Sequence, residues 1–142
     1  MVDDSERLRR LIAKVIADEG HIVANACDGH EAWRACLVAS YDIVIADLRM
    51  PNMGGDELIG RLRASGYSAR SCIMSASFAA PDMSADQMAR MFGADAALAK
   101  PFEIAQLRSV LRFLAVGADA VGNLHESPLV GEAASSRHPS AA

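Results

Sequence analysis

The feature that most constrains the fold is a short apolar run that ends in a carboxylate. Its sequence is IVIAD at residues 43–47, and MPNMGG at residues 50–55 then breaks the chain into a turn. A continuous run of β-branched and small apolar residues is typical of a strand that is buried on both faces, as in a parallel sheet. Open α/β sheets bind their ligands at the carboxyl ends of such strands. Asp47 is therefore the first candidate for a functional residue.

Helical and strand patterns alternate along the rest of the chain. One apolar helix face is predicted within residues 6–19 from the spacing of Leu8, Leu11, Ile12, Val15 and Ile16. Further helices are expected over residues 31–39, 56–64, 84–92 and from about residue 107 onward, and strands over residues 21–26, 43–47, 69–76 and 96–99. This order predicts right-handed crossovers and a doubly wound α/β fold, with helices on both faces of a parallel sheet.

Composition narrows the possible functions. About half of the 142 residues are hydrophobic, which is enough for one domain with a core. The net charge of −4 gives no sign of a nucleic-acid-binding surface. No apolar run approaches the ~18 residues of a membrane span, and the acidic N-terminus lacks a signal-peptide pattern. Three cysteines without C-x-x-C spacing indicate reduced thiols. We expect a cytoplasmic protein that binds neither nucleic acid nor membrane.

The pattern changes after residue 116. Alanine, glycine, serine and proline dominate residues 117–142, and the apolar residues there are isolated. Such a segment buries too little apolar area to offset its ordering entropy. We expect one domain over residues 1–116 and a flexible, disordered tail over residues 117–142.

Polar residues fall at the carboxyl ends of four strands, counting the apolar residues Met1 and Val2 as the end of a first strand. They are Asp3-Asp4, Asp47, Ser75 and Lys100. Neighbouring strand ends converge on one crevice, where three carboxylates repel each other unless a hard cation such as Mg²⁺ binds their oxygens. A lysine and a hydroxyl beside that cation suit a phosphoryl group. The set predicts phosphoryl transfer onto Asp47, although each member alone has a plainer role as a cap, turn or surface residue.

Several motifs together resemble those of the response-regulator receiver domain of two-component signalling. They are VDD at residues 2–4, DLRMPNMGG at 47–55, MSA at 74–76, GAD at 93–95 and KPF at 100–102. No single motif is specific for this family, but the five motifs in this order and at these separations are specific for it. The resemblance covers roughly residues 1–116 and implies a flavodoxin-like, five-stranded parallel sheet of strand order 2-1-3-4-5.

The resemblance also implies roles for single residues. Asp47 would accept a phosphoryl group from a histidine kinase or a histidine phosphotransfer protein. Mg²⁺ would be held by Asp4, Asp47 and the backbone carbonyl of Arg49, with Asp3 nearby or acting through water. Ser75 and Lys100 would take the switch roles. Such a domain is not an enzyme beyond its own phosphorylation and slow dephosphorylation, and its output goes to a downstream protein partner.

The first strand departs from the family pattern. Only Met1 and Val2 precede the acidic pair, where the family has about five apolar residues. That strand lies between the second and third, so its truncation would leave ladder hydrogen bonds unpaired on both neighbours. We expect a start upstream of Met1 or a shortened chain. A damaged domain, and a strand added by another chain, are the alternatives.

Two further departures concern the switch region. Ala97 stands where many receivers carry a tyrosine or phenylalanine whose side chain turns inward when the hydroxyl contacts the phosphate. Alanine has no such side chain, so we expect the output signal to use another route or to rely on backbone shifts. Ser75 and Lys100 are 25 positions apart, slightly more than the family leads us to expect.

Two other functions stay open at this point. The shortened strand favours an interaction module that takes no phosphate. A Mg²⁺-dependent phosphohydrolase with an aspartyl nucleophile has a similar site, but Arg49 stands where such enzymes carry a second acid.

Overall fold

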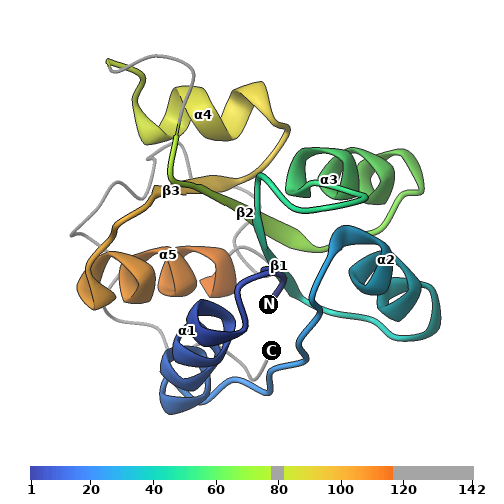
Figure 1. Cartoon of the computed structure of the whole chain (residues 1–142), viewed down its shortest axis with the longest axis horizontal. Helices are drawn as coiled ribbons and strands as arrows, with labels where there is room; N and C mark the ends of the chain where they lie inside the picture. Colours follow the sequence, from blue (N-terminus) through green and yellow to red (C-terminus); the bar gives the residue numbers. More distant parts are fainter. Residues whose placement is uncertain (78–81, 117–142) are drawn as a thin grey trace.

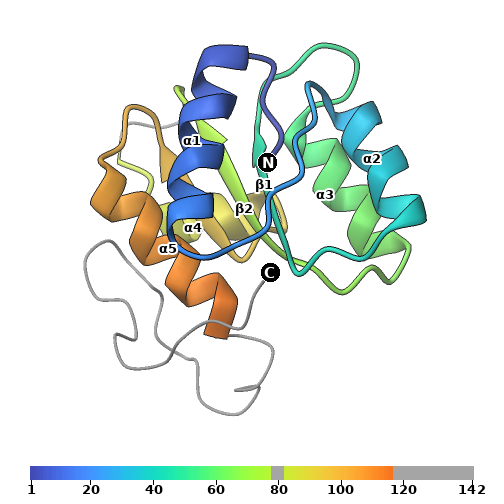
Figure 2. The same ribbon diagram turned by 90° about the horizontal axis from the view of Figure 1, so that it is seen from below.

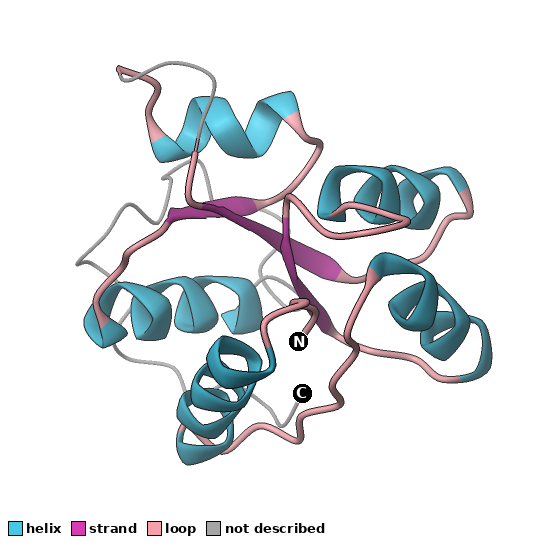
Figure 3. Cartoon of the chain, in the orientation of Figure 1, coloured by secondary structure: helices cyan, strands magenta, loops and turns pink. Residues whose placement is uncertain are grey.

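The computed structural model of the chain describes residues 1–77 and 82–116. Within these residues five helices pack around a parallel three-stranded sheet (Figures 1 and 3). The helices are α1 (Glu6–Asp18), α2 (Gly29–Val38), α3 (Gly55–Ala64), α4 (Ala85–Met91) and α5 (Ile104–Val116). The strands are β1 (Ile43–Asp47), β2 (Arg70–Ser75) and β3 (Ala96–Ala99). The predicted doubly wound α/β class is confirmed.

The sheet has the order β1-β2-β3, and all its pairs are parallel. Val2 extends this order by forming isolated parallel bridges to Ala46 on one side and to Ala26 on the other. The spatial order is therefore the segment at Ala26, then Val2, then β1, β2 and β3. This is the predicted order 2-1-3-4-5, with the first two members reduced to single residues.

The number of strands differs from the prediction. A strand over residues 21–26 was expected, but of these residues only Ala26 takes part in a bridge. The described sheet thus has three strands and not five. The reason is that a strand is defined by its partner, and in the segment beside residues 21–26 Val2 alone forms bridges.

Helices cover both faces of the sheet. α1 and α5 lie on one face, and α2, α3 and α4 lie on the other (Figures 1 and 2). On the first face Ile12 and Ile16 of α1 and Leu111 of α5 pack against Ile45 and its neighbours. The predicted apolar face of α1 is confirmed except at Leu11, which is 54% exposed.

Local signals set the helix ends. Ser84 is the N-cap of α4 and forms a capping box with Gln87. Gly20, Gly66 and Gly93 follow α1, α3 and α4 with φ angles of 92°, 76° and 68°, a left-handed conformation that glycine adopts without a steric penalty.

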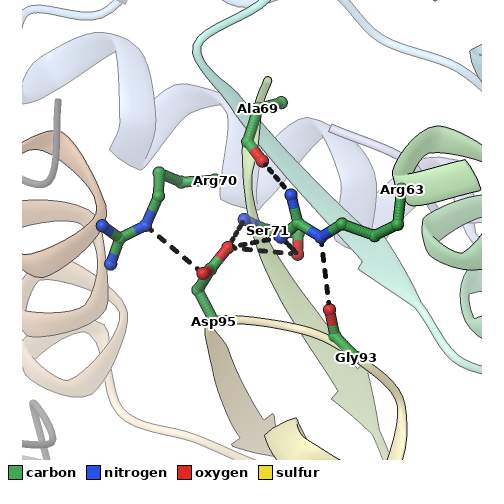
Figure 4. A network of polar contacts seen from close by, with 6 residues as sticks. All are labelled: Arg63, Ala69, Arg70, Ser71, Gly93 and Asp95. Carbon is green, nitrogen blue, oxygen red and sulfur yellow. Dashed lines mark hydrogen bonds and ion pairs between the residues drawn. The ribbon is translucent and has the colours of Figure 1, made fainter. Parts of the chain in front are cut away.

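A polar network joins the amino ends of β2 and β3 (Figure 4). Arg63 of α3 donates to Asp95 Oδ2 at 2.7 Å, to Ser71 Oγ at 3.0 Å and to backbone carbonyls of neighbouring loops. Asp95 Oδ2 also accepts from the Ser71 backbone N–H at 2.7 Å. Arg70 Nε lies 3.5 Å from Asp95 Oδ1, an ion-pair contact without hydrogen-bond geometry. The network fixes α3 to the sheet edge opposite to Asp47.

Part of the predicted organisation lies outside the described residues. This applies to the expected tail at 117–142 and to residues 78–81 of the loop after β2. Among the helices that the structure does describe, none combines the length and the apolar content that a membrane span requires.

Candidate functional site

Residues far apart in the sequence meet at the carboxyl edge of the sheet. Val2 brings Asp3 and Asp4 to this edge, Asp47 is the last residue of β1, and Lys100 directly follows β3. Asp3 and Asp47 are buried, whereas Asp4 is exposed. Each of the three carboxylates offers an oxygen within 4.8 Å of the others. The structure thus brings together the predicted acidic group.

Lys100 connects two of these carboxylates. Its Nζ atom lies 2.9 Å from Asp3 Oδ2 and 2.9 Å from Asp47 Oδ1. The Lys100 backbone N–H donates to the Ser75 carbonyl at 2.7 Å, and the Lys100-Pro101 peptide bond is cis. The β3 end is therefore tied to the β2 end, and this tie holds the lysine over the acidic group.

Burial and charge perturb these groups in a consistent way. Burial raises the pKa of Asp47 above its ordinary value; the charges of Asp3 and Asp4 add to this rise and the contact with Lys100 opposes it. Burial alone would lower the pKa of Lys100, but its hydrogen bonds to Asp47 and Asp3 outweigh that effect and raise it. Without a further cation, ionised Asp47 is thus only partly compensated by one lysine.

Asp3 is held by partners that the sequence did not reveal. Its Oδ1 atom accepts from the Ser5 backbone N–H at 2.8 Å, and its carbonyl accepts from Arg9 Nη1 at 2.7 Å. Ser5 is the N-cap of α1, so the same turn starts the helix and orients the carboxylate. No spacing pattern pointed to Arg9, because its role depends on how α1 packs beside Asp3.

Two predicted site residues form no hydrogen bond or ion pair with the acidic group among the described residues. Ser75 ends β2 and is buried, but its hydroxyl donates to the Ser77 carbonyl at 3.0 Å and accepts from the Ser77 N–H at 3.2 Å. Arg49 is exposed in the loop after β1, and no hydrogen bond among the described residues engages its carbonyl. Ser75 thus has its hydroxyl bonded within its own loop, and Arg49 keeps an acceptor available.

Close packing explains the glycines after Asp47. A Cβ atom at Gly55 would meet the Asp47 carbonyl oxygen and come within 2.8 Å of Ile73 Cδ1. A Cβ at Gly29, at the start of α2, would lie 2.5 Å from the Met53 carbonyl oxygen, and Met53 is fully buried. Only glycine allows α3 and α2 to approach the loop this closely, so these positions hold the loop that carries Arg49.

The donor set fits a hard divalent cation. Three carboxylates offer only oxygen ligands, which Mg²⁺ prefers. Their mutual repulsion and the raised pKa of Asp47 would both be relieved by such an ion. The arrangement can therefore hold a cation beside a buried carboxylate and a lysine, which is suited to binding a phosphoryl group.

Comparison with protein families gives one match that spans most of the chain. A family model described as the response regulator receiver domain matches residues 1–112. Transcriptional regulatory protein TcrA of Mycobacterium tuberculosis is 32% identical over 114 residues, which cover 80% of this chain and 44% of TcrA. Sporulation initiation phosphotransferase F of Bacillus subtilis is 30% identical over 112 residues, covering 79% of this chain and 88% of the relative. The chain thus spans less than half of TcrA.

Solved structures give the same result. The receiver domain of the Francisella response regulator 1452 is 27% identical, with a TM-score of 0.70 over 80% of this chain and 91% of its own. Response regulator TrrA of Thermotoga maritima, solved with Mg²⁺ and BeF, is also 27% identical, with a TM-score of 0.68 over 80% and 94% of the two chains.

Proposed function

Because this chain belongs to the response regulator receiver domain family, we propose that Asp47 is its phosphoacceptor. The donor is a histidine kinase or a histidine phosphotransfer protein of a two-component phosphorelay. The observation that carries this assignment is the contact of Lys100 with both Asp3 and Asp47 beside a third carboxylate, Asp4.

Each residue of the site has a separate role in the proposed phosphoryl transfer. The ionised Asp47 carboxylate attacks the phosphorus of the phosphohistidine, so that a P–O bond forms, the P–N bond breaks and the imidazole leaves. Lys100 remains beside Asp47 and neutralises charge on the transferred oxygens. Asp3, Asp4, Asp47 and the Arg49 carbonyl would hold Mg²⁺, which supplies further neutralisation of the phosphoryl charge when bound.

Ser75 is the proposed conformational element. Its hydroxyl is bonded to Ser77, so a hydrogen bond to the phosphoryl group requires it to leave that partner. This would draw the loop after β2 toward Asp47 and shift the position of α4, which follows that loop. Ala97 is buried against Ile73 and Met88 and has no ring to swing, so we assign the output to this backbone shift.

We propose a downstream protein as the target of the switch and the cytoplasm as the location. The family and the three free cysteines, Cys27, Cys36 and Cys72, support the location. Phosphate uptake and slow self-dephosphorylation would be the only chemistry of the domain, so it would not be an enzyme in the usual sense.

The test is phosphorylation by a small phosphodonor such as acetyl phosphate with Mg²⁺. Intact mass spectrometry should show the addition of one phosphoryl group. Lability of this group in acid and base is expected of an acyl phosphate, the mixed anhydride that a phosphorylated carboxylate forms. Asp47→Asn should abolish it, whereas Asp42→Asn, at an exposed carboxylate just ahead of β1, should not. Labelling that persists in Asp47→Asn would overturn the assignment. A folded chain that neither binds Mg²⁺ nor takes up phosphate would instead be an interaction module.

A further inference from the structure

The turn that carries Asp3 and Asp4 is held on several sides by neighbouring elements. The Asp3 N–H donates to the Ala26 carbonyl at 3.2 Å, and the Asp3 Oδ1 atom accepts from the Ser5 N–H at 2.8 Å. The Asp3 Oδ2 atom lies 2.9 Å from Lys100 Nζ. Asp3 is 1% exposed, so the turn is fixed within the fold. One further contact is made at the Asp3 carbonyl, and its donor is a charged side chain.

That donor is Arg9, a half-buried residue in the first half of α1. Its Nη1 atom donates to the Asp3 carbonyl at 2.7 Å. A charged donor at this distance makes a stronger hydrogen bond than a neutral donor does. The carbonyl belongs to the planar peptide group that joins Asp3 to Asp4, so the bond also fixes the direction in which the chain enters Asp4. Arg9 thus acts on Asp4 through the backbone.

Arg9 also lies close to the loop that precedes α2. The pKa of Glu31 is below its ordinary value, chiefly because of hydrogen bonds from Cys27 and to a smaller extent because of the positive charge of Arg9. Glu31 Oε2 accepts from the Cys27 N–H at 2.7 Å, and Cys27 follows Ala26, which is bonded to the Asp3 N–H. The guanidinium group is therefore near both segments that hold the acidic turn.

The carboxylate of Asp4 has no such support of its own. It is exposed and forms no hydrogen bond or ion pair with any described residue, although one of its oxygens lies within 4.8 Å of oxygens of Asp3 and Asp47. Like charges at this separation repel each other. The position of Asp4 beside Asp47 therefore depends on the backbone at Asp3, which Arg9 fixes.

The charge of Arg9 and its hydrogen bond have opposite effects on a cation at this edge. A guanidinium group stays protonated in proteins, so Arg9 repels a bound cation. If this charge were the main effect, removing it would strengthen cation binding. If the hydrogen bond to the Asp3 carbonyl were the main effect, removing it would weaken cation binding. The sign of the change therefore distinguishes the two roles.

We propose that Arg9 is a positioning residue of the Mg²⁺ site. Its hydrogen bond to the Asp3 carbonyl keeps Asp4 beside Asp47, so that both carboxylates bind the same cation. This inference rests on the proposed function, in which these carboxylates hold Mg²⁺. Groups that orient metal ligands without binding the metal contribute roughly 10–100-fold to its affinity. Arg9 belongs at the lower end of this range, because it acts through the backbone and not on the ligand oxygen.

The test is calorimetric titration of Mg²⁺ into the full chain. Arg9→Met keeps an apolar stem but removes the donors and the charge, and Mg²⁺ should bind to it roughly tenfold more weakly than to the wild type. Arg9→Lys keeps the charge, but its shorter side chain does not reach the carbonyl in the same way, so its affinity should also fall. Arg7→Met is the matched control, because Arg7 is exposed on the same helix and forms no hydrogen bond or ion pair with the described residues. Its Mg²⁺ affinity should be unchanged or slightly higher.

The kinetics of phosphorylation by acetyl phosphate separate positioning from chemistry. In Arg9→Met the Mg²⁺ concentration that gives half of the maximal rate should rise roughly tenfold. The rate at saturating Mg²⁺ should stay within about twofold of the wild type, because Asp47 and Lys100 are intact.

Amide hydrogen exchange in a chelator gives a measurement without metal or phosphate. The Ser5 amide is bonded to Asp3 Oδ1, so it should exchange faster in Arg9→Met but not in Arg7→Met. The Leu48 amide is bonded to the Met74 carbonyl at 2.7 Å, and its unchanged protection shows that the variants are folded.

Three results would overturn the positioning role. The first is an Mg²⁺ affinity of Arg9→Met that equals or exceeds that of the wild type. The second is a lower rate at saturating Mg²⁺ with an unchanged Mg²⁺ requirement. The third is unchanged exchange of the Ser5 amide. If Arg9→Met does not fold, Arg9→Lys decides by the same criteria. A wild-type chain that binds no Mg²⁺ would overturn the metal site itself, so that failure is distinct from a failure of the role of Arg9.

Discussion

At the residue scale, Asp47 is set in an environment that disfavours its charge. Burial raises its pKa, and Lys100 relieves the penalty only in part because Asp3 shares the lysine. Such a carboxylate is costly for stability but favourable for binding a cation. The two consequences can be measured separately.

Replacing Asp47 by asparagine should stabilise the metal-free fold. A raised pKa means that Asp47 contributes stability below its unfolded value near 3.8, and that this contribution is lost as the pH rises through the folded pKa. Asparagine cannot ionise, so the Tm of Asp47→Asn should exceed that of the wild type at about pH 7. The difference should shrink toward zero below the unfolded pKa. Thermal unfolding across this pH range, in a chelator, tests it.

Asp42→Asn is the matched control, because its carboxylate lies just ahead of the same strand and is exposed. Its Tm should follow the wild type at every pH. An Asp47→Asn variant that is less stable than the wild type at neutral pH would show that the Lys100 contact outweighs burial.

Gly55 is the second residue whose environment makes a specific prediction. Gly55→Ala would force a Cβ against the Asp47 carbonyl and Ile73, and overpacking of this kind costs about 2 kcal/mol. Gly60→Ala in the same helix meets nothing within 4 Å and should stabilise the fold by about 0.5–1 kcal/mol through helix propensity. Urea unfolding of the two variants measures the sign of each change in the free energy of unfolding. Equal stability of the two variants would contradict the packing seen at Gly55.

At the scale of elements, the chain is tied together at both edges of the sheet. The carboxyl edge is joined by Lys100, and the amino edge by Arg63 and Asp95 (Figure 4). Arg70, beside Asp95, also lies over the Phe113 ring of α5 at 5.0 Å. The amino-edge network therefore connects α3, β2, the start of β3 and α5.

Removing Asp95 should weaken that connection strongly. Asp95→Ala leaves the Ser71 N–H and two guanidinium groups without their shared carboxylate, and we expect a loss of about 2–3 kcal/mol. Glu57→Ala removes an exposed partner of Arg61 within α3 and should cost less than about 0.5 kcal/mol. Shifts of the denaturation midpoint, at an unchanged slope of the unfolding free energy against denaturant concentration, measure both losses of stability. Similar small losses in the two variants would show that the network does not stabilise the fold.

At the scale of the whole molecule, one residue connects the core with the acidic site. Val2 is 3% exposed and bridges both Ala26 and Ala46, and Asp3 and Asp4 follow it directly. Packing around Val2 therefore determines where two of the three carboxylates lie. A substitution at Val2 should therefore change both the free energy of unfolding and the affinity for the cation.

Val2→Ala should lower stability by about 2 kcal/mol through the cavity it leaves. It should also weaken Mg²⁺ binding, because Asp3 and Asp4 lose their fixed position. Val38→Ala, at a residue 86% exposed, should change stability by less than about 0.5 kcal/mol and leave Mg²⁺ binding intact. Unfolding and Mg²⁺ calorimetry are the measurements. Unchanged Mg²⁺ affinity in Val2→Ala would show that packing around Val2 does not determine the position of the carboxylates.

The sequence predicted the elements well where the information is local. The apolar run at residues 43–47 and the periodic apolar face of α1 act within a few residues, so these elements could be predicted from spacing. The prediction of a strand at residues 21–26 was wrong because a strand forms only against a partner strand, and in the neighbouring segment Val2 alone forms bridges.

The sequence by itself determined that Asp3, Asp4, Asp47, Ser75 and Lys100 follow the ends of elements at one edge of a parallel sheet. Only the tertiary structure decided that Lys100 binds Asp3 across 97 positions, that Arg9 holds the Asp3 carbonyl, and that the Ser75 hydroxyl bonds to Ser77. The periodicity of apolar residues is a property of a single helix or strand, so it can be recognised from the sequence of that element alone. Contacts between elements depend on how those elements pack.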